Sequence, residues 1–296
     1  MARWFAGLAF WCALVCGARA DVLDATPRTA VISAFPPELA ALSAAATDKR
    51  DYTVGGVVFT TATLEGRPVL LFLSGVSMVN AAMTTQMALD RFKLTRLVFS
   101  GIAGGADPAL EIGDVVVADR WAQNMESVFA RETPQGFAAP PDFLDALGPH
   151  FGMIYPRGVR LPGDAAPRVW FPADSALVAK AARAAKRVKL RRCLERACLD
   201  KAPKVVIGGA GVSSPAFVDN AAYREFLHRE FGVRLIDMES AAVAHVAAAN
   251  GVAFVALRSL SDLAGGDAGE NQMHVFMGLA ARNSAAVVRA FLQELE

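Results

Sequence analysis

Short apolar runs rich in β-branched residues alternate with stretches of helical spacing along most of this chain. The run at residues 29–34 precedes a helical stretch at 38–47, and the run at 233–238 precedes another at 239–250 that ends at Gly251. Strands that alternate with helices indicate a mostly parallel or mixed sheet covered on both faces. We therefore predict an α/β fold, with a single domain at residues 21–296.

The alternation continues through the rest of the chain, which has 296 residues and is 54% hydrophobic, enough to bury a large core. We expect strands at 54–74 (a hairpin turning at 65–68), 94–100, 114–119, 204–211 and 252–261, and helices at 79–92, 220–231 and 272–295. Residues 119–203 are rich in proline and less regular. They are predicted to be an insertion that packs on the domain or covers its site, with a helix at 175–192.

The first twenty residues have the pattern of a secretory signal. Arg3 precedes an apolar stretch at 4–17, and Ala18 and Ala20 place small residues before Asp21. We predict cleavage after residue 20 and a secreted or periplasmic protein; an uncleaved membrane anchor is the alternative. Of 30 basic and 29 acidic residues, two arginines leave with the signal, so the mature charge is about −1. This balance favours neither nucleic acid nor a membrane as partner.

Signal cleavage also removes two cysteines and leaves Cys193 and Cys198. In an oxidising compartment this pair suggests a local disulfide. An α-helix would hold the two Cα atoms about 8 Å apart, so the bond requires the preceding helix to end near Arg192. Two reduced thiols are the alternative. Zinc is disfavoured because no histidine lies at ligand spacing, and we expect no metal.

Acidic residues follow several predicted strands, at the sheet edge where α/β proteins bind small molecules. Asp262 ends an apolar strand, where shielding from water would raise its pKa and suit it to donate a proton; capping a turn is the alternative. Glu239 starts a helix and could accept two hydrogen bonds from vicinal ribose hydroxyls. Glu38 could activate water or be an ordinary first-turn carboxylate.

A glycine loop at residues 100–105 follows the strand 94–100. It lacks the Gly-Lys-Ser/Thr of a phosphate-binding loop, so its glycines favour close approach of backbone to a sugar or base. Phe217 could stack on a planar base or simply pack.

These residues resemble the nucleoside phosphorylase superfamily and, within it, the 5′-methylthioadenosine/S-adenosylhomocysteine nucleosidases. The resemblance covers about residues 29–119 and 205–295 and rests on four motifs in order: SGIAGG (100–105), IGDVVVAD (112–119), IDMESAAVAHV (236–246) and VALRSLSD (255–262). The signal and the string VDNAAYREF (218–226) are also similar to the secreted plant bark storage proteins and their bacterial relatives.

The resemblance implies a purine-nucleoside site in which two carboxylates are catalytic. Asp262 would protonate purine N7 with Ser261 beside it, and Glu38 would orient or deprotonate the attacking water. Glu239 would bind the 2′ and 3′ hydroxyls of ribose, with Met238 beside it.

The resemblance also implies contacts with the purine base and adds three further residues to the site. Phe217 would stack on the base and the backbone of Val218 would contact it. Arg258 matches the arginine before the catalytic aspartate. Gly104 and Ile102 complete the predicted set, although Ile102 stands where the family usually has Ser or Thr.

The resemblance also implies a homodimer that needs no cofactor. Phosphorylases of the superfamily bind phosphate with arginines at places held here by Glu38 or its neighbours and by Phe99, which favours water as the nucleophile. The prolines Pro36 and Pro37 before Glu38 depart from the family pattern. The predicted function is hydrolysis of methylthioadenosine-type or S-adenosylhomocysteine-type nucleosides; a phosphate-dependent phosphorylase and a non-catalytic nucleoside-binding or storage-like protein are the alternatives.

Overall fold

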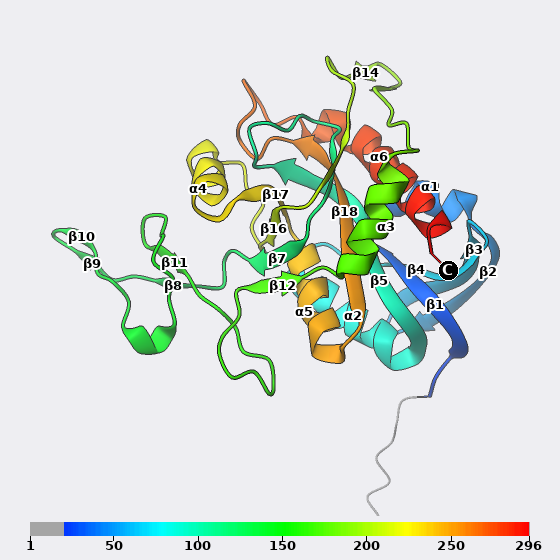
Figure 1. Ribbon diagram of the computed structural model, residues 1–296, viewed down its shortest axis with the longest axis horizontal. Helices are drawn as coiled ribbons and strands as arrows, with labels where there is room; N and C mark the ends of the chain where they lie inside the picture. Colours follow the sequence, from blue (N-terminus) through cyan, green and yellow to red (C-terminus); the bar gives the residue numbers. More distant parts are fainter. Residues whose placement is uncertain (1–20, 296) are drawn as a thin grey trace, which may run out of the picture.

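A mixed sheet of 12 strands forms the centre of the protein. The computed structural model describes residues 21–295, so the predicted signal segment lies outside the described residues. The main path of the sheet runs β12-β7-β16-β17-β5-β1-β4-β3-β2, with β18 paired to β5 and β6 and with β15 paired to β6 (Figure 1). The predicted α/β class with a mixed central sheet is confirmed.

The strands of this sheet are β1 (Asp24–Ser33), β2 (Thr47–Val54), β3 (Val57–Leu64), β4 (Arg67–Leu73), β5 (Phe92–Gly105), β6 (Val115–Val117), β7 (Arg120–Gln123), β12 (Trp170–Pro172), β15 (Val205–Ile207), β16 (Ala210–Ser213), β17 (Val233–Asp237) and β18 (Ala253–Asp262). Short strands outside it are β8 (Ser127–Phe129), β9 (Glu132–Thr133), β10 (Gly136–Phe137), β11 (Ile154–Pro156), β13 (Cys193–Leu194) and β14 (Ala197–Cys198). The helices are α1 (Pro36–Ala45), α2 (Met78–Arg91), η1 (Asp142–Leu144), α3 (Ser175–Ala185), α4 (Ala221–Phe231), α5 (Ser240–Asn250) and α6 (Met273–Gln293).

Helices cover both faces of the sheet because successive strand residues point to opposite sides. On β1, Val31 belongs to the core cluster shared with α1, α3 and α6, whereas Ala30 and Ile32 belong to the cluster shared with α2 and α5 (Figure 1). α6 has the length and composition of a membrane-spanning helix, but much of it, including Val288 and Phe291, is buried in the core. We therefore interpret α6 as a core helix.

The strand pairings bring the predicted site segments together. β1 and β18 both pair in parallel with β5, so Ile32 and Ala256 flank Phe99 in register. β17 runs antiparallel to the end of β5, with Ile236 opposite Gly104. The segments that follow β1 and β17 therefore meet beside the glycine-rich end of β5.

Three local predictions are wrong. The glycine loop is not a loop, because β5 continues through Gly105 in pairing with β18 and β17. The single strand expected at 204–211 is divided by Gly208 and Gly209, both with positive φ, into β15 and β16, which pair with different neighbours. The helix expected to reach Arg192 ends at Ala185, well before the disulfide.

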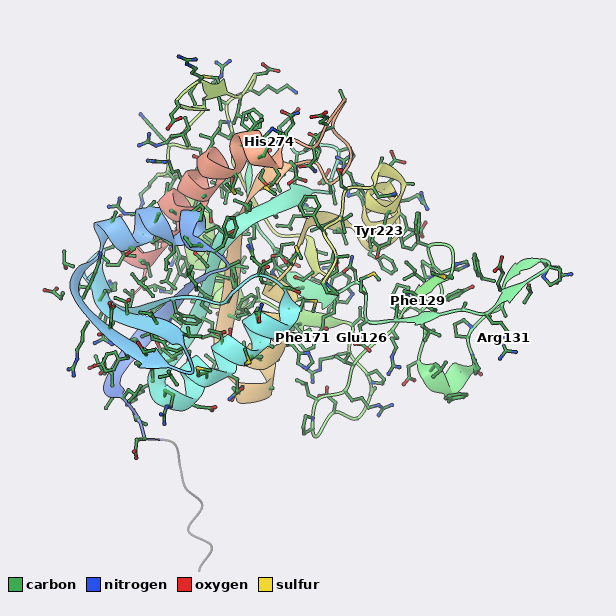
Figure 2. All side chains as sticks on the ribbon, turned by 180° about the vertical axis from the view of Figure 1, so that it is seen from behind. Glu126, Phe129, Arg131, Phe171, Tyr223 and His274 are labelled. Carbon is green, nitrogen blue, oxygen red and sulfur yellow. A yellow bond between two sulfur atoms is a disulfide. The ribbon has the colours of Figure 1, made fainter. Side chains whose placement is uncertain are left out.

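The irregular segment at 119–203 is not one unit, and it ends in the small hairpin of β13 and β14. Strands β7 and β12 belong to the main sheet, and α3 packs on the α6 side of it. Residues 124–168, with β8 to β11, form an arm that projects from the body of the protein, with Phe129 and Arg131 far out on it (Figure 2).

Candidate functional site

A cavity of about 380 Å³ lies at the end of β1, the glycine-rich end of β5, and the ends of β17 and β18. Its remaining walls come from Val76 before α2, the segment 216–218 and the start of α6. The irregular segment 119–203 contributes no side chain to this lining. The part of the chain that matches the predicted family least therefore does not line the cavity.

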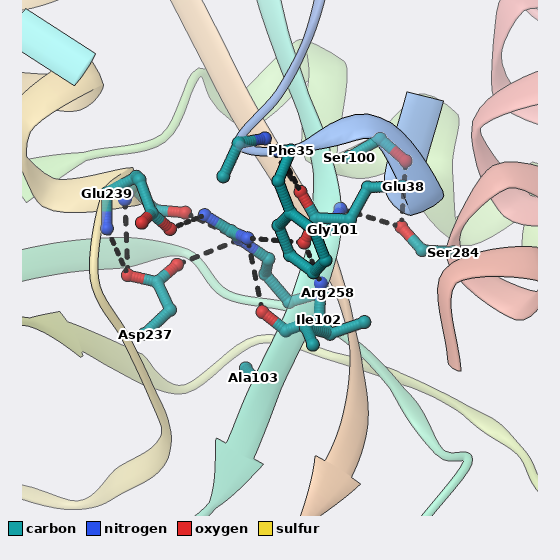
Figure 3. Close-up of polar contacts among 12 residues, drawn as sticks. Phe35, Glu38, Ser100, Gly101, Ile102, Ala103, Asp237, Glu239, Arg258 and Ser284 are labelled. Carbon is teal, nitrogen blue, oxygen red and sulfur yellow. Dashed lines mark hydrogen bonds and ion pairs between the residues drawn. The ribbon is translucent and has the colours of Figure 1, made fainter. Parts of the chain in front are cut away.

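Arg258, on β18, lies beneath the cavity and is completely buried. Its guanidinium is surrounded by three carboxylates (Figure 3): Nε lies 2.8 Å from Oδ2 of Asp237, Nη2 donates to Oε2 of Glu239 at 3.1 Å, and Nη1 lies 3.6 Å from Oε1 of Glu38. We call these four residues the Arg258 cluster. A buried cation is tolerated only when its charge is paired and its donors are used.

The Arg258 guanidinium also contacts a hydroxyl, a backbone carbonyl and an aromatic ring. Nε donates to Oγ of Ser240 at 3.0 Å, and Nη1 donates to the carbonyl oxygen of Ile102 at 3.1 Å. The Phe99 ring lies against its face, with the guanidinium carbon 4.1 Å from the ring centroid. Phe99 therefore supports Arg258 from below and does not reach the cavity, and all three guanidinium nitrogens already contact protein oxygens.

Glu38, in the first turn of α1, is held by one backbone amide before this helix and one on β5. Oε2 accepts from the N–H of Ala34 and Oε1 accepts from the N–H of Ile102, each at 2.7 Å. Pro36 and Pro37 occupy the first turn of α1, where a missing N–H costs no helical hydrogen bond. Since Ile102 holds Glu38 through its backbone, neither departure from the family pattern displaces the carboxylate.

The pKa of Glu38 is raised to about 7. Burial is the largest cause, and the charge of Arg258 and the two amides offset only part of it. A carboxyl group with this pKa can take up and release a proton near neutral pH, as a general base must.

Asp262 ends β18 on another side of the cavity and is 2% exposed. Oδ1 accepts from the N–H of Ala264 at 2.9 Å and from Nδ2 of Asn271 at 3.4 Å, and Oδ2 accepts from the hydroxyl of Ser261 at 2.9 Å. Burial raises its pKa despite these donors. A Cβ at Gly104 would lie 2.9 Å from Oδ1, so the bare backbone of β5 leaves the room that Asp262 occupies.

Glu239 is the residue before α5 and extends between two donors. Oε1 accepts from the N–H of Ser77 at 2.9 Å, and Oε2 accepts from Arg258. Burial is the main cause that raises its pKa, and the neighbouring Asp237 adds to it. Ser77 has a φ of 80°, a conformation that is strained for any residue except glycine and that marks functional sites.

Nine of the predicted site residues line the cavity: Glu38, Ile102, Gly104, Phe217, Val218, Met238, Glu239, Ser261 and Asp262. Phe217 is 53% exposed, so its ring forms part of the rim and is not packed in the core. Arg258 does not line the cavity but supports it from beneath. Cys193 and Cys198 form a disulfide outside the cavity.

Sequence reasoning missed other residues of the site. Met273 and Met277 line the cavity, and their spacing of four on α6 was a usable signal. Asp237 accepts from the hydroxyl of Ser213 and from the N–H groups of Glu239 and Ser240, so it fixes the start of α5. No local pattern shows that it also pairs with Arg258. Within residues 21–295, no group of three or more His, Cys, Asp or Glu side chains is arranged to hold a metal ion.

Comparison with known families gives one match over most of the chain. The family model described as the phosphorylase superfamily matches residues 28–293, including the irregular segment. A protein of Mycobacterium bovis, named 5′-methylthioadenosine/S-adenosylhomocysteine nucleosidase, is 31% identical over 276 residues, covering 90% of this chain and 96% of the relative. A protein of the same name from Geobacillus thermodenitrificans is 30% identical over 266 residues, covering 90% and 96%.

Solved structures agree with these relatives. The nucleosidase of Neisseria meningitidis in complex with methylthio-immucillin-A has a TM-score of 0.69 and 25% identity, and the match covers 90% of this chain and 99% of that one. The nucleosidase of S. pneumoniae with a transition-state inhibitor has a TM-score of 0.68 and 26% identity, covering 91% and 100%.

Gly101→Ala should damage the Arg258 cluster directly. A Cβ at this position would overlap the guanidinium of Arg258 and the carboxyl of Glu38, so both must move. We expect a loss of roughly 1–3 kcal/mol in the free energy of unfolding, measured by urea denaturation. Gly148→Ala is the control, because its Cβ would meet nothing within 4 Å. Equal stability of the two variants would contradict this account of β5.

Glu38 should make the protein less stable as pH rises. Its folded pKa of about 7 lies above the ordinary value of 4.5, so its contribution is fully present below pH 4.5 and is lost as pH rises through 7. The loss corresponds to about 3 kcal/mol. Denaturant titrations of the wild type between pH 4.5 and 8 should show a downward component that Glu38→Gln removes.

Glu65 provides a control of opposite sign for this titration. Its partial burial is outweighed by hydrogen bonds from Gln293 and Arg289, which lower its pKa. Glu65→Gln should therefore leave the slope between pH 4.5 and 8 unchanged, and should remove a contribution that the wild type loses only as pH falls below 4.5 through the lowered pKa. If Glu38→Gln left the pH dependence of the wild type unchanged, the raised pKa of Glu38 would be disproved.

Proposed function

The chain belongs to the phosphorylase superfamily, and we propose that within it the protein is a nucleosidase that hydrolyses the N-glycosidic bond of nucleosides of the 5′-methylthioadenosine/S-adenosylhomocysteine type. The observation that carries this proposal is the placement of Glu38, Glu239 and Asp262, three buried carboxyl groups with raised pKa values, around one cavity. The relatives named for this activity match about nine-tenths of the chain.

We assign each carboxyl group a separate role in glycosidic cleavage. Asp262, whose pKa is raised by burial, donates a proton to N7 of the purine as the C1′–N9 bond breaks and its electron pair moves into the base. Phe217, at the rim, offers a ring for the base to stack on. Glu239 accepts hydrogen bonds from the ribose hydroxyls and, with its negative charge, favours the cationic sugar that forms.

Glu38 completes the reaction on the sugar side. Its carboxylate removes a proton from water as the water oxygen bonds to C1′, which yields the free purine and the free sugar. With its pKa near 7, Glu38 is ionised in enough molecules to act at neutral pH. Arg258 keeps Glu38 and Glu239 in place without touching substrate, since it lies beneath the cavity.

Water is favoured over phosphate as the nucleophile because no Lys or Arg occurs among the described residues that line the cavity. The guanidinium of Arg258 beneath the cavity is occupied by carboxylates and by Ser240 and Ile102. A phosphate dianion would face Glu38 and Glu239 without a cation of its own.

Asp262→Asn tests the proposal. The wild type should release adenine from methylthioadenosine or S-adenosylhomocysteine at the same rate with and without phosphate, and the substitution should lower kcat by roughly 10²–10⁴-fold because the proton donor is lost. Liquid chromatography of the released base and sugar gives both results. Asp51→Asn, on exposed β2, is the control and should keep wild-type activity.

The alternatives give different results in the same assay. Phosphate-dependent release of a sugar 1-phosphate would identify a phosphorylase. Tight binding of nucleoside by calorimetry, with no base released by the wild type, would identify a non-catalytic binding or storage-like protein.

We also propose that residues 1–20 are removed during export and that the mature protein acts outside the cytoplasm as a homodimer. The signal pattern and the Cys193–Cys198 disulfide support export, since disulfides persist in oxidising compartments. Exposed apolar side chains at the start of α2, among them Val79 at 77% and Met83 at 55% exposure, support self-association. The similarity to the secreted bark storage branch stays a prediction.

Native mass spectrometry of the protein exported by a bacterial host checks both points. We expect chains that begin at Asp21 and a complex of twice the chain mass. Chains that still begin at residue 1 would contradict signal cleavage. A monomer at micromolar concentration would contradict the homodimer.

A further inference from the structure

The disulfide-closed hairpin lies beside the first half of α6 and has no role in the chemistry above. Cys193 and Leu194 pair with Ala197 and Cys198, and the disulfide joins the two ends of this ladder. Figures 1 and 2 both show the hairpin alongside α6, which starts near His274. Two strands of two residues cannot hold their shape in water, so the disulfide maintains the hairpin.

The base of the hairpin is fastened to α6 and to the body of the protein. Oδ1 of the buried Asn283 accepts from the N–H of Arg191 at 2.8 Å, and Nδ2 of Asn283 donates to the carbonyl oxygen of Arg191 at 3.0 Å. The Arg192 side chain donates to the carbonyl oxygens of Leu199 and Asp200 at 2.7 and 2.9 Å. Leu199 is 6% exposed. The hairpin is therefore a fixed element.

The tip of the hairpin packs on the first turns of α6. Residues 194–197 share a groove with Val275 and Gly278. A Cβ at Gly278 would lie 3.0 Å from Cδ2 of Leu194, so Leu194 fills the space that the glycine leaves. Gly278 lowers the helical propensity of this segment relative to alanine, and the hairpin occupies the space that a side chain would.

The same turns of α6 have one other support at their start. The side chain of Gln272 makes no capping hydrogen bond, but Oδ1 of Asn271 accepts from the N–H of Met273 at 2.9 Å, and the buried residues of α6 begin only at Leu279. Met273 and Met277 on these turns line the cavity. The first turns of α6 thus lie between the cavity and the hairpin.

We propose that the disulfide-closed hairpin, through Leu194, is a positioning element that holds the α6 wall of the substrate cavity. The proposal rests on the proposed nucleosidase function only for its effect on substrate. Asp262 is held by Ser261 and Ala264 at shorter distances than by Asn271 beside α6, and Glu38 and Glu239 are held by the Arg258 cluster. Within residues 21–295, none of the hydrogen bonds and ion pairs of these three carboxyl groups involves the hairpin. Loss of the hairpin contact should weaken substrate binding and leave the chemical step intact.

The test uses the mature protein with Cys193→Ser and Cys198→Ser together and, separately, Leu194→Ala, which keeps the disulfide. For both variants we expect faster amide hydrogen exchange in residues 273–278 and a KM for methylthioadenosine raised roughly three- to tenfold, with kcat within about twofold of wild type. Leu194→Met, which keeps the volume, should restore both values. Thr133→Ala loosens the β9–β10 hairpin on the projecting arm and serves as the control.

The two readouts separate failure of this proposal from failure of the proposed function. Unchanged exchange in 273–278 in Leu194→Ala would overturn the positioning role, whatever the activity. Should the wild type cleave no nucleoside, the proposed function fails while exchange still tests the hairpin. An equal fall of kcat in Leu194→Ala and Thr133→Ala would show general destabilisation and would also overturn it. If the double serine variant does not fold, Leu194→Ala decides.

Discussion

The site depends on one buried cation. Arg258 is fully inaccessible and brings Asp237, Glu239 and Glu38 around its guanidinium. Removing one partner from such a group costs about 3–5 kcal/mol, because a charge is then left unpaired in a medium of low dielectric. The three segments after β1, before α5 and along β18 therefore hold one another in place. Their position is set by charge pairing as well as by packing.

Three carboxylates share one guanidinium, so the cluster cannot neutralise all of them. Burial then raises the pKa values of Glu38 and Glu239, and it also raises that of Asp262 across the cavity. A site that must hold one carboxyl protonated and use another as a base near pH 7 needs this kind of environment. Burial makes the Arg258 cluster unfavourable to assemble, and the same burial raises the pKa values that Glu38 and Glu239 need for their chemistry.

Two glycines of β5 are needed because large charged side chains pack directly against the strand at these positions. Gly101 leaves room for Arg258 and Glu38, and Gly104 leaves room for Asp262. They were predicted to allow a ligand close to a loop backbone, but the segment is a strand that pairs on both sides. A run of glycines does not show whether the backbone approaches a ligand or is packed against neighbouring side chains, because both arrangements require residues without a side chain. Likewise Phe99, interpreted as the absence of a phosphate-binding arginine, is also the surface on which Arg258 rests.

The sequence by itself determined the α/β class and most elements, because hydrophobic periodicity is a local signal. Strand-end carboxylates, together with the family resemblance, predicted nine of the cavity residues. The sequence could not place the division of β15 from β16 or the continuation of β5, since these depend on which strands pair, and it placed the end of α3 at Arg192 instead of Ala185. Only the tertiary structure decided that Arg258 lies beneath the cavity and that the hairpin at Cys193 packs on α6. The physical reason is that contacts between Glu38 and Arg258, 220 positions apart, exist only once β1, β5 and β18 are assembled.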